Sequence, residues 1–181
     1  RLVGTTKAGA LHAIPLTGKL IGKGAGDLGT KYAGHLCIDD SMKADDAKSP
    51  AKVAALHFLY GNTLVSRPAQ GSTPTILMQQ RLGCDDLAYF LMSGGSGAVF
   101  DWINIPAIIT KETGSQAWYD EQIERHGYTH VKPILYDLNR KDSEYNEHGE
   151  SSFWSARKTI DELYAMKNAD PYTFYSQYMG D

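Results

Sequence analysis

Two adjacent aspartates, Asp39 and Asp40, come directly after the short apolar run HLCI of residues 35–38. A continuous apolar run of this length is typical of a strand buried in a parallel sheet. Open α/β sheets bind their ligands at the carboxyl ends of such strands. There one carboxylate can hold Mg²⁺ through its water shell, and a second can orient and deprotonate an attacking water. The pair indicates a magnesium-dependent hydrolytic site, whereas solvated aspartates at a strand end are the simpler alternative.

The residues just before this run have the composition of a phosphate-binding loop. Such a loop has the order G-x-x-x-x-G-K-[ST], in which backbone amides and the lysine surround the phosphates. Gly24 and Gly29 have the required separation. Thr30 and Lys31 follow them in the reverse order, and residues 32–38 lead into a strand where the loop should open a helix. We therefore interpret this stretch as a connection before a strand, without a phosphate cradle.

Strands and helices are expected to alternate along the chain. The apolar runs predict strands over residues 10–16, 35–38, 72–80 and 101–108. Helical spacing predicts helices over residues 49–66, 84–92, 155–169 and 170–180. Their starts are marked by Ser49 with Pro50, by Asp85 and Asp86, by Ser155, and by Asp170 with Pro171. This alternation predicts an α/β layered domain with a mostly parallel sheet.

Residues 109–151 are polar, acidic and without clear periodicity. We expect a long surface excursion there, with residues 111–150 as its body. Trp118, Tyr119 and Tyr128 lie in it. These aromatic side chains either stack on DNA or attach the excursion to the core.

The composition is that of an ordinary soluble globular protein, since 42% of the 181 residues are hydrophobic and 22% are charged. This length suits one domain. No apolar run approaches the roughly 20 residues of a membrane-spanning helix. Cys37 and Cys84 are too few for a disulfide framework and lie in apolar sequence, which favours reduced thiols in a cytoplasm. The net charge of −3 argues against a protein that coats DNA with its whole surface, and favours at most a local basic patch.

Several stretches together carry a likeness to a known family. In chain order they are LHAIPLTGKLIGKGAGD, HLCIDDSMKADDAKSP, TILMQQRLGCDDLAYFLM, INIPAI and ESSFWSARKTIDELYAMKNADPYTFYSQYMGD. The chain resembles the large terminase subunit of tailed bacteriophages, the ATP-driven motor that packages DNA into a capsid. The likeness covers nearly the whole chain except residues 111–150, and its most specific parts are QQRLGCDDL and DPYTFYSQY.

The resemblance implies a RecA-like P-loop NTPase fold of the ASCE type, with a mostly parallel sheet flanked by helices. In that family the phosphate loop would lie before residue 1 and a nuclease domain after residue 181. Residues 1–181 would then be the back half of the ATPase domain, from the Walker B strand to the linker helices. This fragment alone is expected to be inactive as an ATPase.

The resemblance also implies roles for individual residues. Asp39 matches the magnesium-coordinating aspartate of the Walker B strand, and Asp40 matches the catalytic carboxylate, which is often glutamate in related motors. Gln79 and Gln80 end the next strand, where the family places a polar residue that senses the γ-phosphate. Gln80 aligns better, because it precedes the family's arginine, here Arg81. Gln79 and Arg81 are expected to contact the nucleotide, and solvated glutamines at a strand end are the alternative.

A trans-acting cation is expected in IGKGAGD, where the family usually has an arginine and this chain has Lys23. Lysine carries the positive charge but lacks the planar guanidinium with which arginine binds a phosphate through two hydrogen bonds. It is therefore less suited to this role. Lys31 or Arg67 can take the same role.

ATP and Mg²⁺ are the cofactors that the resemblance implies. The implied partners are double-stranded viral DNA, the portal protein, the small terminase subunit and further copies of the chain in a ring, with no membrane. The implied location is the host cytoplasm. Two other classes stay open: another nucleic-acid remodelling ATPase such as a helicase, and a non-enzymatic assembly module.

Overall fold

The computed structural model describes residues 2–4, 10–16, 24–25, 34–68 and 73–180. Two compact units are present. Unit 1 comprises Arg1–Ser41 and Phe58–Met78, and unit 2 comprises Met42–His57 and Gln79–Asp181.

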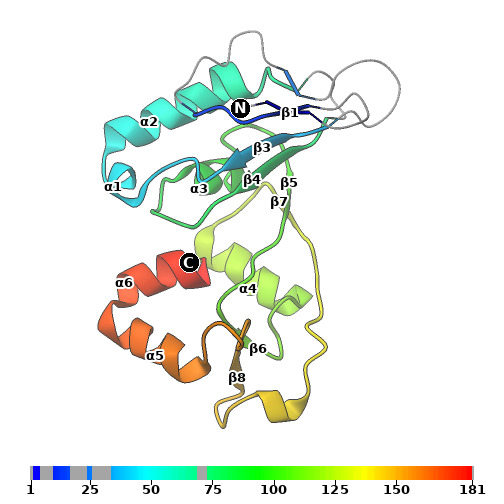
Figure 1. The fold of residues 1–181 in the computed structure, drawn as a ribbon, viewed down its shortest axis with the longest axis vertical. Helices are drawn as coiled ribbons and strands as arrows, with labels where there is room; N and C mark the ends of the chain where they lie inside the picture. Colours follow the sequence, from blue (N-terminus) through cyan, green and yellow to red (C-terminus); the bar gives the residue numbers. More distant parts are fainter. Residues whose placement is uncertain (1, 5–9, 17–23, 26–33, 69–72, 181) are drawn as a thin grey trace. The chain divides into compact units, whose positions relative to one another are not determined.

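The described residues of unit 1 form two pairs of strands (Figure 1). Strands β1 (Leu2–Gly4) and β2 (Ala10–His12) are antiparallel. Strands β3 (Leu36–Asp39) and β4 (Thr75–Met78) are parallel. The predicted strands at residues 10–16 and 72–80 are therefore confirmed with shorter bounds, and the strand at 35–38 is confirmed with a shift of one residue.

Strand β3 alternates between a buried and an exposed face. Ile38 is buried, whereas Cys37 and Asp39 are exposed. On β4, Ile76 and Met78 are exposed in the same register. The expectation of a strand covered on both faces is wrong for the described residues, because this two-stranded sheet has one open face.

Helix α2 (Pro50–Leu59) begins in unit 2 and continues into unit 1 as the π-helical turn η1 (Tyr60–Leu64). Pro50 occupies its first turn, where the N–H that proline lacks would have had no partner within the helix. Val53, Leu56 and Tyr60 are buried at helical spacing, which is consistent with the helix predicted over residues 49–66.

Unit 2 holds the remaining elements. They are α1 (Ala44–Ala47), α3 (Leu87–Met92), β5 (Phe100–Trp102), β6 (Ile108–Thr110), α4 (Gln116–His126), β7 (Val131–Pro133), the 3₁₀ turn η2 (Asp142–Glu144), β8 (Glu150–Ser152), α5 (Ile160–Ala169), α6 (Pro171–Phe174) and the π-helical turn η3 (Tyr175–Met179). β5 and β7 pair in parallel, and β6 and β8 pair antiparallel.

Two predictions about this unit are wrong. The single strand expected over residues 101–108 is divided into β5 and β6, with Pro106 between them, and proline cannot donate a ladder hydrogen bond. The excursion of residues 109–151 is not irregular throughout, since it contains α4 and β7. Helix α4 is capped at its start by Ser115, whose side chain accepts from the Trp118 N–H, and it ends at Gly127 with a φ of 68°.

The last two helices are confirmed with one correction. Helix α5 begins after Thr159 and not after Ser155, because Thr159 and Glu162 form a capping box. Helix α6 begins at Asp170 and Pro171 as predicted. Gly180 ends η3 in the left-handed conformation.

The core of unit 2 joins early and late segments. Ile108, Leu163 and Phe174 form one buried cluster. Within residues 109–151, where the excursion was predicted, Tyr119 and Tyr128 are buried. Both rings pack edge-on against Trp102. These two tyrosines therefore attach the excursion to the core, which is one of the two roles predicted for them.

The chain is a mixed α/β protein, as expected. Within the described ranges its strands form four separate two-stranded sheets, two parallel and two antiparallel, in place of one larger parallel sheet. In the same ranges, no helix has the length and apolar character needed to cross a membrane.

Candidate functional site

The two predicted acids lie where β3 ends. Asp39 is the register partner of Met78, the last residue of β4. The backbone N–H of Asp40 donates to the carbonyl of Met78 at 3.0 Å. The carboxyl ends of both strands are therefore at one edge of the parallel pair, and Gln79 follows Met78 directly in the chain.

Asp40 has a backbone conformation that few side chains adopt. Its φ is 43°, in the left-handed region, and Asn139 is the other described non-glycine residue with a positive φ. Aspartate and asparagine tolerate this region better than other residues, at a cost on the order of 1 kcal/mol. Such outliers are concentrated at functional sites, so the geometry singles out Asp40 within the pair.

Asp39 and Asp40 are both exposed, so their carboxylates are open to a ligand. The described residues contain no group of three or more His, Cys, Asp or Glu side chains that could hold a metal by themselves. Magnesium bound with a nucleotide commonly uses only one or two carboxylates together with phosphate oxygens.

Gln79, Gln80 and Arg81 begin the second segment of unit 2, which runs from Gln79 to Asp181. Gln79 is half-buried and Gln80 is exposed. Of the two amides, Gln80 is therefore the more exposed to solvent.

Arg81 is held inside unit 2 by several groups. Its side chain is only 11% exposed, and its Nε–H donates to Asp86 Oδ2 at 3.0 Å. Its Nη1–H donates to the hydroxyl of Tyr128, and its Nη2–H to the carbonyl of Gly83 at 3.3 Å. The guanidinium carbon also lies 5.8 Å from the ring centroids of Tyr89 and Tyr128.

Three residues are candidates for the expected trans-acting cation, namely Lys23, Lys31 and Arg67. Lys23 and Lys31 lie outside the described residues. Nearby in sequence, Ala25 forms a parallel bridge with Pro68, and its N–H donates to the carbonyl of Arg67 at 2.9 Å. The half-buried Arg67 side chain donates to the Thr63 carbonyl at 3.0 Å.

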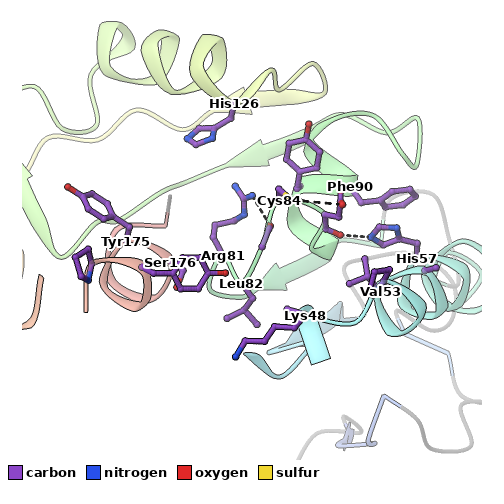
Figure 2. A pocket seen from close by; sticks show the side chains of 18 residues that line it. Lys48, Val53, His57, Arg81, Leu82, Cys84, Phe90, His126, Tyr175 and Ser176 are labelled. Carbon is purple, nitrogen blue, oxygen red and sulfur yellow. Dashed lines mark hydrogen bonds between the residues drawn. The ribbon is translucent and has the colours of Figure 1, made fainter. Parts of the chain in front are cut away.

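A cavity of about 1100 Å³ in unit 2 was not predicted from the sequence (Figure 2). Segments distant in sequence line it, and in the view of Figure 2 Arg81 lies between Ser176 and His57. The His57 ring stacks on Phe90 with centroids 4.1 Å apart, and its Nε2–H donates to the Asp85 carbonyl at 3.0 Å. No sequence motif could have indicated this cavity, because its walls come together only in the fold.

Comparisons with protein-family models, with curated proteins and with solved structures found no match to this chain. Its function is therefore inferred from the residues and their geometry, together with the sequence resemblance described above.

Proposed function

We propose that the chain is part of a DNA-packaging motor ATPase of the large-terminase type, with a RecA-like P-loop fold. The observation that supports this most is the pair Asp39–Asp40 at the end of β3, beside the end of the parallel strand β4, with Asp40 in a left-handed conformation. Paired acids at the carboxyl end of a parallel strand are what a nucleotide-hydrolysing site requires.

In this proposal the two acids divide the work. Asp39 holds Mg²⁺, and when bound the metal offsets the charge on the β- and γ-phosphates. Asp40 orients the attacking water and accepts its proton. The Gln80 amide, which can both donate and accept, senses the γ-phosphate.

Cations complete the site. The resemblance places the phosphate loop before residue 1, and it assigns the trans-acting charge to Lys23, with Lys31 or Arg67 as substitutes. Since lysine lacks the bidentate fork, Lys23 would act as a point charge on the neighbouring subunit's nucleotide.

The partners follow from the same resemblance. Hydrolysis would drive double-stranded viral DNA into the capsid, in a ring of identical subunits docked on the portal protein and served by the small terminase subunit. The parent protein would also carry a nuclease domain and would act in the host cytoplasm.

The metal dependence of ATP turnover tests the role of Asp39. In the complete gene product, Asp39→Asn should raise the Mg²⁺ concentration needed for half-maximal turnover by roughly tenfold or more. The matched control is Asp45→Asn. Asp45 is an exposed acid, and its Oδ1 lies 3.6 Å from Nζ of Lys48 in a solvent-exposed ion pair. An identical Mg²⁺ requirement in the two variants would remove Asp39 from the metal site.

Two further results would favour the rival functions. DNA strand separation that needs no capsid would indicate another nucleic-acid remodelling ATPase such as a helicase. Calorimetry that detects no binding of Mg-ATP by the complete gene product would indicate an assembly module.

A further inference from the structure

Asp86 is the centre of a buried polar cluster that follows Gln80. Its side chain is fully buried and accepts three hydrogen bonds. The Oδ1 atom accepts from the Tyr89 N–H at 2.8 Å, which caps α3. The Oδ2 atom accepts from the Leu82 N–H at 2.8 Å and from Arg81 at 3.0 Å. Asp86 therefore fixes the backbone between residues 81 and 89.

Arg81 extends this cluster across the fold. Three of the five guanidinium N–H groups donate to acceptors of the protein, namely Asp86, Tyr128 and the Gly83 carbonyl. Asp86 also neutralises the charge of Arg81. An arginine held in this way is poorly suited to binding a phosphate, but it fixes the direction in which the preceding residue, Gln80, leaves the strand.

Tyr128 connects the cluster to the rest of unit 2. It follows Gly127, the left-handed cap of α4, and the residue is 4% exposed. The next two residues, Thr129 and His130, both donate their N–H groups to the Met92 carbonyl, at 3.1 and 2.8 Å. Since Met92 ends α3, the segment between α4 and β7 is joined to both ends of α3.

We propose that Arg81, Asp86 and Tyr128 are positioning residues that hold Gln80 in place and link it mechanically to α4 and β7. This inference rests on the proposed function, because Gln80 is the residue assigned to sense the γ-phosphate. It replaces the expectation that Arg81 itself contacts the nucleotide. Loss of the γ-phosphate at Gln80 would then move the segment of residues 127–133 through the Arg81–Tyr128 bond.

Removing the hydroxyl of Tyr128 tests the link to Arg81 without creating a large cavity in the core. Tyr128→Phe keeps the ring in contact with Trp102 and deletes the hydroxyl that accepts from Arg81. The matched control is Tyr136→Phe, which deletes a hydroxyl that donates to the Asn104 carbonyl at 2.6 Å, outside the cluster. ATP turnover of the complete gene product is measured for both variants.

The expected result is a drop in kcat of about tenfold in Tyr128→Phe relative to Tyr136→Phe, with an unchanged KM for ATP. Equal kcat values in the two variants would overturn the link. A rise in KM of about tenfold with unchanged kcat would also overturn it, because that result means that Arg81 binds the nucleotide.

Amide hydrogen exchange separates this inference from the proposed function. In the same two variants, Tyr128→Phe should speed exchange in residues 79–86, far from position 128 in the sequence, and Tyr136→Phe should not. This result needs no ATP. If ATP hydrolysis is absent and exchange in residues 79–86 is still faster, the proposed function fails while the positioning cluster stands. Unchanged exchange would contradict the cluster whatever the turnover.

Discussion

The carboxylate of Asp86 accepts a hydrogen bond from the Nε–H of Arg81 at 3.0 Å, and Asp86 is completely buried. A buried carboxylate is stable only when it is paired and its oxygens are all hydrogen-bonded. Here the partners are one guanidinium and two backbone N–H groups. The same side chain therefore balances a charge and begins a helix.

Replacing this carboxylate should destabilise the protein strongly. Asp86→Asn keeps an oxygen for the cap of α3 but leaves the charge of Arg81 without its counter-ion inside unit 2. Breaking a buried pair in this way costs about 3 kcal/mol of unfolding free energy. Urea unfolding measures the loss.

The neighbouring acid is the control for this change. Asp85 is exposed, and the hydrogen bond that it accepts from His57 uses its backbone carbonyl. Asp85→Asn should therefore alter the unfolding free energy by no more than about 0.5 kcal/mol. Equal effects of the two substitutions would show that Asp86 is not the counter-ion on which Arg81 depends.

The left-handed backbone of Asp40 predicts which substitutions the site tolerates. Asp40→Asn should leave stability nearly unchanged, because asparagine also adopts a φ near 43°. Asp40→Ala should lower the unfolding free energy by about 1 kcal/mol. Thermal unfolding of the two variants side by side checks this, and an alanine variant as stable as the asparagine variant would contradict the assigned conformation.

Gly114 is a position where any added side chain would clash with the backbone of another segment. Its φ is 88°, and an added Cβ would lie 2.6 Å from the carbonyl oxygen of Tyr136. Gly97 also has a positive φ, 71°, but an added Cβ there meets nothing within 4 Å. Gly114→Ala should therefore lower the unfolding free energy by at least about 1 kcal/mol more than Gly97→Ala. Equal losses in chemical denaturation would mean that the close approach to Tyr136 is absent.

The capping box of α5 predicts a pH-dependent contribution to stability. The backbone N–H and the hydroxyl of Thr159 donate to Glu162 and hold the pKa of that carboxyl below its ordinary value of 4.5. A pKa that is lower in the folded state stabilises the fold above the unfolded value, and the contribution is lost as the pH falls through the folded value.

The variant Glu162→Gln isolates this contribution. Its melting temperature should be lower than that of the wild type at about pH 7, and the gap should shrink as the pH is lowered below 4.5. The control is Glu124→Gln, which removes an exposed carboxylate on α4. A gap for Glu162→Gln that stays constant across this range would exclude the ionised carboxylate as the source of the stabilisation.

Local signals in the sequence predicted several elements correctly. The apolar run before Asp39 became β3, and Asp170 with Pro171 began α6, because strand periodicity and cap chemistry act over a few residues. Helix α4 was missed because only Tyr119 and Gln122 are buried on it, so it lacks a continuous apolar stripe. The start of α5 could have been read correctly, since Glu162 three residues after Thr159 marks a capping box.

Only the features of the candidate site that lie in neighbouring residues of the chain could be predicted from the sequence. Adjacent aspartates at a strand end are visible in the sequence, and the parallel pairing of Asp39 with Met78 agrees with that interpretation. The bond between Arg81 and Tyr128 joins residues 47 positions apart, so no local pattern encodes it. The conformation of Asp40 likewise depends on the turn that follows β3, and composition does not reveal it.

The most direct test of the central claim is ATP turnover by the complete gene product carrying Asp40→Asn, with Asp45→Asn as the matched control. If Asp40 orients and deprotonates the attacking water, kcat falls at least about a hundredfold while the KM for Mg-ATP stays close to that of the control. Turnover equal to that of the control variant would contradict the proposed site.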